Sequence, residues 1–382
     1  MKHFSDTNQK LELWLKNQVF PLWTKNAFDC DSGAFIESLN SSGHAENTSR
    51  RALVQARQIY AYTEALKLNI LPKEQVSLII GKNIEFIKHY SLPSGAYLHA
   101  LDSKNNPVET QSELYTQAFM LFGLARAFEI LKDSQIKDRA IALAHYLKSE
   151  RKNKAGGFTE IKNNKIVFQS NPHMHLFEAV IEWMKIDADG IWKELASELY
   201  QLCLTKFTNN DIQAVAEYFT QDWQVLSEDN KFIFEPGHQY EWAWLIIQYE
   251  ELLSLKKTTL PLKLFDLAEK HGVDSKSNLA FDEILSDFKV NKTSARFWPQ
   301  CERIKAAVQL GVLATPELKP RFAKAADEAM AALSTYFETK IPGLWFDTKT
   351  ENRFVLQSSK ASSLYHILNA ISEYKLKRLL LS

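Results

Sequence analysis

His238 and Glu241 lie three residues apart where a long apolar segment, residues 234–253, begins. Pro236 and Gly237 precede them, so a helix is expected to start here with both side chains on one face of its first turn. A histidine beside a carboxylate can exchange a proton near neutral pH, so the pair could act as an acid/base unit. The alternative is that these two residues only form a polar cap at the start of a buried helix.

The composition argues against several classes of function. Lys plus Arg and Asp plus Glu both total 46 in 382 residues, so no basic surface for nucleic acid is expected. The cysteines, Cys30, Cys203 and Cys301, are too far apart for a zinc motif and fit a reducing compartment. No apolar run is long enough to span a membrane, and the first residues lack the apolar core of a signal peptide. We expect a cytoplasmic protein.

One sequence pattern recurs six times along the chain. It consists of a small residue, an aromatic residue in a short extended run, a polar turn and a long apolar helix. The aromatic residues recur at intervals of 61 to 64 residues, which is enough for two helices and a hairpin in each unit. These aromatic residues are Phe35, Tyr97, Phe158, Phe219, Phe281 and Trp345.

Each unit combines a helix that is apolar on most sides with one that is apolar on a single side. Six such pairs could stack as an open superhelix or close into a ring. We expect closure, because an open stack should end in polar caps and the last unit is as apolar as the middle ones. The predicted fold is all-α: residues 1–382 form a single (α/α)6 barrel of six helix pairs, with short β-hairpins at the mouth.

Polar residues that do not suit a core gather where each hairpin leads into an apolar helix. If these helices run parallel around a barrel, the six junctions surround one mouth, and histidines from three units face one pocket. This arrangement favours a chemical role for His238. The junction residues are Arg57, Tyr115, Gln117, Asn171, His173, His175, His238, Glu241, Trp298, Gln300, Glu302 and His366.

Several junction residues also have structural explanations. Arg57 could pair with a neighbouring carboxylate, and Asn171 could cap the helix that follows it. His173 and His175 are two residues apart and so lie on different faces of a helix, which argues against a joint metal site. We expect one of them to face the pocket and the other to be structural.

Trp298 and His366 likewise have both a functional and a structural explanation. Trp298 is as well suited to packing as to forming a platform for a sugar ring. His366 lies where an apolar helix begins, so a core histidine with satisfied hydrogen bonds is the alternative.

The motifs NPHMHLFEA, EPGHQYEWAW, FWPQCE and SSLYH, with QARQIY upstream, resemble the N-acylglucosamine 2-epimerase superfamily. The branch most similar is that of mannose isomerases and related aldose–ketose isomerases. The resemblance extends from about residue 10 to residue 375. It implies an (α/α)6 barrel, in agreement with the repeats, and a reaction that uses no metal and no cofactor.

The resemblance also implies roles for individual residues. His366 would be the base that takes a proton from C2 of the sugar and returns it to C1. His238, oriented by Glu241, would be the second acid/base. Arg57 would polarise the O1 and O2 region of the sugar. Substrate binding is assigned to Arg57, Tyr115, Asn171, His175 and Trp298.

Two departures from the superfamily narrow the substrate. N-acetylglucosamine epimerases lack the NPHMH run, so an N-acetyl sugar is not expected. Cellobiose epimerases place a tryptophan shortly before the last histidine, where this chain has Ala361 and Ser362. The sequence therefore argues against a disaccharide and for a monosaccharide. No phosphate-binding loop of the GxxxxGK type is present, which favours a free sugar.

The chemistry of aldose–ketose isomerisation suits these residue types. It requires a base for the C2 proton and a fixed positive charge for the enediolate oxygen, as a histidine and an arginine would supply. We expect interconversion of D-mannose and D-fructose by a monomer or homodimer. The alternatives are a 2-epimerase acting on mannose or glucose and a sugar-binding protein without activity. A glycoside or unsaturated uronyl hydrolase would use carboxylates from Asp222, Glu178 or Glu241.

Overall fold

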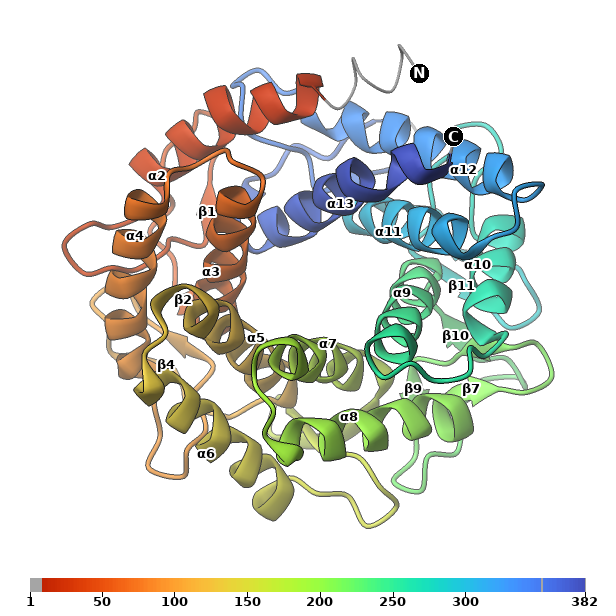
Figure 1. Ribbon diagram of the computed structural model, residues 1–382, viewed down its shortest axis with the longest axis horizontal. Helices are drawn as coiled ribbons and strands as arrows, with labels where there is room; N and C mark the ends of the chain where they lie inside the picture. Colours follow the sequence, from red (N-terminus) through yellow and green to blue (C-terminus); the bar gives the residue numbers. More distant parts are fainter. Residues whose placement is uncertain (1–8, 352, 382) are drawn as a thin grey trace.

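The computed structural model describes residues 9–351 and 353–381. Within them, helix pairs are arranged in a closed ring (Figure 1), so the predicted (α/α)6 barrel is confirmed. Residues 1–8, which carry part of the expectation about a signal peptide, lie outside the described residues. No described helix is long and apolar enough to cross a membrane.

An inner ring of helices alternates along the chain with an outer ring (Figure 1). The inner helices are Ala52–Lys67 (α3), Leu114–Leu131 (α5), Ser170–Ile186 (α7), Pro236–Leu252 (α9), Phe297–Leu313 (α11) and Leu364–Lys377 (α13). The outer helices are Phe20–Asn26 (α2), Lys73–Phe86 (α4), Ser134–Glu150 (α6), Gly190–Leu202 (α8), Leu260–His271 (α10) and Lys319–Ser334 (α12). π-helical turns at Leu15–Val19 (η1) and Cys203–Phe207 (η3) adjoin α2 and α8.

The hydrophobic patterns explain the two rings. Helix α9 is apolar on most faces and is buried along most of its length, which suits a helix enclosed by neighbours on all sides. Helix α8 buries Trp192, Leu195, Ala196 and Leu199, which recur at three and four residues and form a single apolar stripe. A one-sided helix of this kind covers the inner ring and faces solvent.

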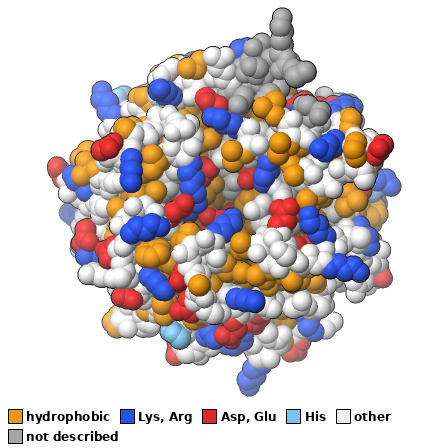
Figure 2. Space-filling model, in the orientation of Figure 1, with side chains coloured by type: hydrophobic (Ala, Val, Ile, Leu, Met, Phe, Trp, Pro, Cys, Tyr) orange, Lys and Arg blue, Asp and Glu red, His pale blue; other side chains and the backbone are white. Residues whose placement is uncertain are grey.

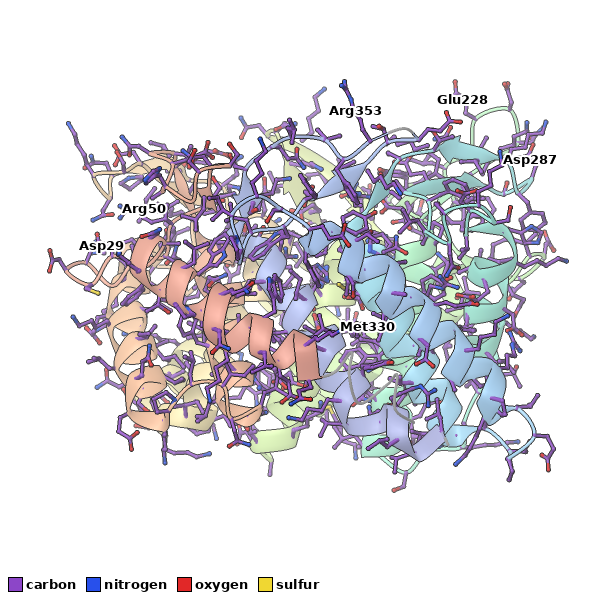
Figure 3. All side chains as sticks on the ribbon, turned by 90° about the horizontal axis from the view of Figure 1, so that it is seen from above. Asp29, Arg50, Glu228, Asp287, Met330 and Arg353 are labelled. Carbon is purple, nitrogen blue, oxygen red and sulfur yellow. The ribbon has the colours of Figure 1, made fainter. Side chains whose placement is uncertain are left out.

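Short strands lie at one end of the barrel, the end at which Arg50, Glu228, Asp287 and Arg353 are labelled in Figure 3. Most of them join neighbouring units, because a strand that precedes an inner helix pairs with a strand of the next unit. The strands are Ser38–Leu39 (β1), Arg50–Arg51 (β2), Ala100–Leu101 (β3), Pro107–Glu109 (β4), Glu160–Lys162 (β5), Lys165–Gln169 (β6), Thr208–Asn209 (β7), Ala214–Val215 (β8), Tyr218–Phe219 (β9), Ile233–Phe234 (β10), Glu283–Leu285 (β11), Val290–Lys292 (β12), Ala295–Arg296 (β13), Thr348–Lys349 (β14) and Ser359–Lys360 (β15).

The first and last units close the ring. Strand β1 pairs antiparallel with β15, and helix α13 packs against α3. Trp23 Nε1 donates a hydrogen bond to the carbonyl of Gly343 at 2.9 Å, and the Trp23 indole stacks on Trp345 with ring centroids 4.6 Å apart. The open superhelix that the sequence allowed is therefore wrong.

A polar side chain in every unit clamps the backbone of the hairpin before it. In five units it both accepts from the amide and donates to the carbonyl of one residue; in the third, His173 only accepts from the amide of Phe158. This explains Gln117 and Gln300, which are structural. The clamping residues and their partners are Gln55 with Phe35, Gln117 with Tyr97, His173 with Phe158, Gln239 with Val215, Gln300 with Ala280 and Ser359 with Trp345.

The clamps correct two of the aromatic positions read from the repeats. In the fourth and fifth units the clamped residues are Val215 and Ala280, not Phe219 and Phe281. Phe219 instead lies in β9, paired with Phe168 of the preceding unit. The repeat is therefore a repeat of backbone geometry, and an aromatic residue does not occupy the clamped position in all six units.

Candidate active site

The mouth of the barrel holds a cavity of about 340 Å³, near the lower end of the range for small-molecule sites, roughly 300–1,000 Å³. Residues at or near the start of the inner helices line it, because these helices all begin at this end. The eight predicted site residues all lie in its wall: Arg57, Tyr115, Asn171, His175, His238, Glu241, Trp298 and His366.

The three histidines of the cavity wall each place Nδ1 against a glutamate. His238 Nδ1 donates to Glu217 Oε2 at 2.9 Å, and His366 Nδ1 donates to Glu302 Oε1 at 2.9 Å. His175 Nδ1 lies 3.3 Å from Glu178 Oε2. A carboxylate that holds Nδ1–H fixes the orientation of the ring and leaves Nε2 for the substrate. These pairs can therefore move protons in the cavity.

The predicted partner of His238 is corrected. Glu217, which precedes strand β9, binds His238, whereas Glu241 does not. Glu241 lies one turn further into the barrel, with Oε1 3.6 Å from His175 Nδ1. Neither oxygen of Glu241 has a hydrogen-bond partner among the described residues. Burial and the nearby Glu302 raise the pKa of Glu241 well above its usual value.

His238 and His366 are shifted in opposite directions. Burial lowers the pKa of His238, but the charges of Glu217 and Glu235 outweigh this effect and raise the pKa to about 9. Burial, together with the positive charges of Arg57 and Lys305, lowers the pKa of His366 well below 6.5. At neutral pH one imidazole is therefore a proton donor and the other a proton acceptor, a division found where acid and base act together.

Trp298 contacts both of these imidazoles. Its ring centroid is 5.0 Å from that of His238 and 5.8 Å from that of His366. The two histidines, far apart in sequence, therefore line the same small cavity. Trp298 is thus part of the cavity wall beside both acid/base groups, although the sequence left packing as an equal explanation.

Arg57 carries a buried charge without an ion pair among the described residues. One terminal nitrogen donates to Tyr115 Oη at 2.8 Å and the other to the carbonyl of Ser362 at 3.3 Å, while the guanidinium lies 4.0 Å from the centroid of Phe119. Its Nε has no hydrogen-bond partner among the described residues. The pairing with a carboxylate that the sequence allowed is therefore wrong, and the charge is available to a ligand.

The NPHMH run contributes one structural histidine and one histidine that faces the cavity. His173 is structural, because Nδ1 donates to the carbonyl of Gln169 and Nε2 accepts from the amide of Phe158. His175 faces the cavity, and burial lowers its pKa to about 4. Asn171 is not a helix cap, since α7 begins at Ser170 after Gln169; its Oδ1 is buried and has no partner among the described residues.

Sequence reasoning named Glu302 and Glu178 but did not pair them with the histidines, and it missed Glu217. Glu217 lies in the bend between β8 and β9, where no helical spacing relates it to His238. Glu302 belongs to the FWPQCE motif, but only the fold shows that it faces His366. Asp222, considered as a hydrolytic carboxylate, lies on an exposed turn and does not line the cavity.

Among residues 9–351 and 353–381, two groups of side chains have donor atoms close enough to hold a metal ion. They are His175, Glu178 and Glu241, and Glu217, Glu235 and His238, each with donor atoms within 4.8 Å. A positive charge already lies at each group. The raised pKa of His238 keeps it protonated in the second, and the ammonium of Lys305 acts on Glu241 and Glu178 of the first.

A closed helical barrel with histidine–glutamate pairs and an unpaired arginine at its mouth defines a candidate proton-transfer enzyme. The profile of the N-acylglucosamine 2-epimerase family matches residues 33–370. The chain therefore belongs to this family, as the motifs indicate. The predicted class of enzyme, a sugar isomerase or epimerase, is confirmed at this level.

Individual relatives of the chain carry the names of sugar isomerases and epimerases. The chain is 31% identical to mannose-6-phosphate isomerase of Rhizobium meliloti (strain 1021) over 96% of both chains. It is 27% identical to D-mannose isomerase of Marinomonas mediterranea, over 72% of this chain and 74% of that protein. The solved structure of cellobiose 2-epimerase from Spirochaeta thermophila superposes with a TM-score of 0.85 at 18% identity, covering 99% of this chain and 98% of that one. At 18% identity, the similarity to this structure shows only that the two proteins share a fold.

Gly237→Ala is expected to raise KM about tenfold with a smaller fall in kcat. A Cβ at Gly237 would lie 2.5 Å from the Trp298 ring, so the indole must move away from both histidines. Steady-state kinetics test this. Gly81→Ala is the control: it has open space and should leave kinetics unchanged. Kinetics of Gly237→Ala equal to those of the unchanged protein would contradict this role of Trp298.

Proposed function

We propose that this protein interconverts D-mannose and D-fructose. The observation that carries the proposal is that a neutral His366 and a protonated His238 line one cavity and both contact the ring of Trp298. In the open-chain aldose, Nε2 of His366 removes the proton from C2, and the electrons move to make an enediolate. The same imidazole then delivers a proton to C1, so a C2–H bond breaks and a C1–H bond forms.

Arg57 and His238 support the remaining steps. Charge develops on O1 and O2 in the enediolate, and the unpaired guanidinium of Arg57 would stabilise it. O1 gains a proton while O2 loses one, so the atoms balance without an oxidant. The imidazolium of His238 can protonate the ring oxygen of the pyranose as the bond from C1 to that oxygen breaks, while the O1 hydroxyl gives up its proton to water, and so open the ring before isomerisation. Asn171, Tyr115, His175 and Glu241 complete the wall that would orient the hydroxyls.

A free sugar suits the rim better than a sugar phosphate. Arg51, Arg296 and Lys360 line the cavity, but each is paired with a carboxylate, at 2.7, 2.9 and 3.2 Å respectively. A phosphate dianion there would also face Glu235 and Asp347. Ion pairs offer donors and acceptors side by side, as neutral hydroxyls need. We expect kcat/KM for D-mannose to exceed that for mannose 6-phosphate at least about tenfold; the reverse order would make the phosphate the substrate.

The same site supports 2-epimerisation as the alternative. Two imidazoles of opposite protonation in one cavity could address opposite faces of C2, so that His366 removes a proton from one face and His238 delivers a proton to the other. The two reactions differ in their products. Isomerisation in heavy water gives fructose with deuterium at C1, whereas epimerisation of mannose gives glucose with deuterium at C2.

Incubation of the purified protein with D-mannose in heavy water, followed by NMR, tests the proposal. Fructose labelled at C1 is the expected product. Glucose labelled at C2 as the main product would replace isomerisation by epimerisation. Binding of mannose without exchange of any carbon-bound hydrogen would leave a sugar-binding protein, and hydrolysis of a glycoside would favour the hydrolase class that shares this toroidal architecture.

The pH dependence of kcat/KM is expected to be bell-shaped. His366 must be neutral, so activity is lost as pH falls through its pKa, which lies well below 6.5. His238 must be protonated, so activity is lost as pH rises through about 9. Glu217→Gln removes the carboxylate that raises the pKa of His238 and should move the alkaline limb to lower pH. An unmoved limb, with circular dichroism showing a folded protein throughout, would contradict the assignment.

A further inference from the structure

A buried lysine beneath the cavity has no part in the reaction described above. Lys305, on α11, has no exposed side-chain surface and does not line the cavity. Its Nζ lies 2.6 Å from Glu302 Oε2 and 3.9 Å from the centroid of the Trp244 ring. Lysines are rarely buried completely, because an ammonium loses its hydration there. Its presence therefore calls for a role that a neutral side chain could not fill.

The carboxylate of Glu302 links this lysine to His366. Oε1 accepts from His366 Nδ1 at 2.9 Å, and Oε2 faces Lys305. Glu302 is also without exposed surface. Each oxygen thus has one cationic or donor neighbour, so rotation of the carboxylate would break both contacts. The imidazole held in this way keeps Nδ1–H toward Glu302 and presents Nε2 to the cavity.

Other charged groups surround the three residues. Glu241 and His238 belong to α9, Glu178 and His175 to α7, and Tyr365, which donates to Glu178, to α13. The charge of Arg57 on α3 also acts on His366. Without Lys305 the glutamates of this cluster would lie together with no buried ammonium among them. The positive charge of Lys305 therefore offsets the negative charge of the glutamates next to His366.

We propose that Lys305 is a positioning residue for proton transfer: it holds the Glu302 carboxylate against His366 Nδ1, and so keeps the imidazole oriented with Nε2 free for the substrate. The proposal rests on the proposed role of His366 as the base. The charge of Lys305 is permanent, because burial lowers its pKa but Glu302, Glu241 and Glu178 outweigh burial and raise it. The same charge lowers the pKa of His366.

Lys305→Met tests this, because methionine keeps much of the side-chain length and removes the charge. We expect kcat to fall about 10- to 100-fold, KM for D-mannose to change less than about threefold, and the acid limb of kcat/KM to move up by about one pH unit. Lys305→Arg should keep the limb at its original pH. A lysine that only fills space would lower the melting temperature without moving the limb, and that outcome overturns the proposal.

A second measurement does not depend on catalysis. In protein labelled with 15N-histidine, NMR gives the tautomer and the titration midpoint of His366 directly, whichever sugar the enzyme uses. We expect Lys305→Met to raise this midpoint; an unchanged midpoint overturns the proposal even if isomerisation is confirmed. A raised midpoint in a protein inactive on mannose would retain the Lys305 inference and reject the proposed reaction.

Lys305→Met leaves buried carboxylates uncompensated and so risks unfolding. Lys305→Met combined with Glu241→Gln removes one positive and one negative group and restores the balance, while Glu302 and His366 stay unchanged. The double variant is expected to fold and to show the raised His366 midpoint. Failure of both variants to fold would assign Lys305 a purely structural role and overturn the proposal.

Discussion

His366→Gln is expected to lower kcat for D-mannose by about a thousandfold, within the range of roughly 10²–10⁴ for the loss of a general base. Glutamine has no group that can accept the C2 proton and deliver a proton to C1, while its amide can still hydrogen-bond to Glu302. The loss corresponds to about 4 kcal/mol in the activation free energy. Initial rates of fructose formation measure it, and deuterium uptake at C1 should fall in parallel.

The effect belongs to chemistry only if the variant remains folded and binds sugar. The melting temperature and the dissociation constant for mannose should therefore change little. His145→Gln is a suitable control, because His145 is an exposed histidine on the outer helix α6. Fructose formation by His366→Gln within about tenfold of the unchanged rate would remove His366 as the base, and His238 would then be the next candidate.

The fold could be predicted because it repeats. Six units of similar length and similar hydrophobic pattern required six similar helix pairs, and the apolar last unit required a partner, which α3 and β1 of the first unit provide. Closure then placed every helix start at one mouth. The eight site residues meet in one cavity for this reason, even though no spacing along the chain relates residue 57 to residue 366.

The partners of these residues could not be predicted in the same way. Helical spacing paired His238 with Glu241, but His238 Nδ1 donates to Glu217, which lies in the bend just before strand β9. Whether Asn171 capped α7 depended on a boundary one residue away. Opposite protonation of His238 and His366 depends on the sum of charges from several helices. Local patterns carry none of this information.

Arg57→Met is expected to lower kcat about 10²- to 10³-fold, which is the effect of removing a single group that stabilises an oxyanion. The guanidinium is the one cation of the cavity wall that lacks a carboxylate partner among the described residues, so its charge is free for the enediolate. Arg57→Lys keeps the charge but loses the planar guanidinium, so its kcat should lie between that of the unchanged protein and that of Arg57→Met. Arg321→Met, a change on the outer helix α12, is the control for the loss of a guanidinium.

Stability separates this role from a structural one. A structural arginine would cost stability when removed, as expected for Arg126, which pairs with Glu64, Glu129 and Glu182. Arg57 is buried and has no such ion pairs among the described residues, so its replacement by methionine ends the desolvation of a charge without a carboxylate partner, at the cost of its hydrogen bonds to Tyr115 and Ser362 and its contact with Phe119. We expect the melting temperature of Arg57→Met to be unchanged or higher while activity falls. A marked loss of melting temperature with kcat within about tenfold would show that Arg57 holds the barrel together and that another group stabilises the enediolate.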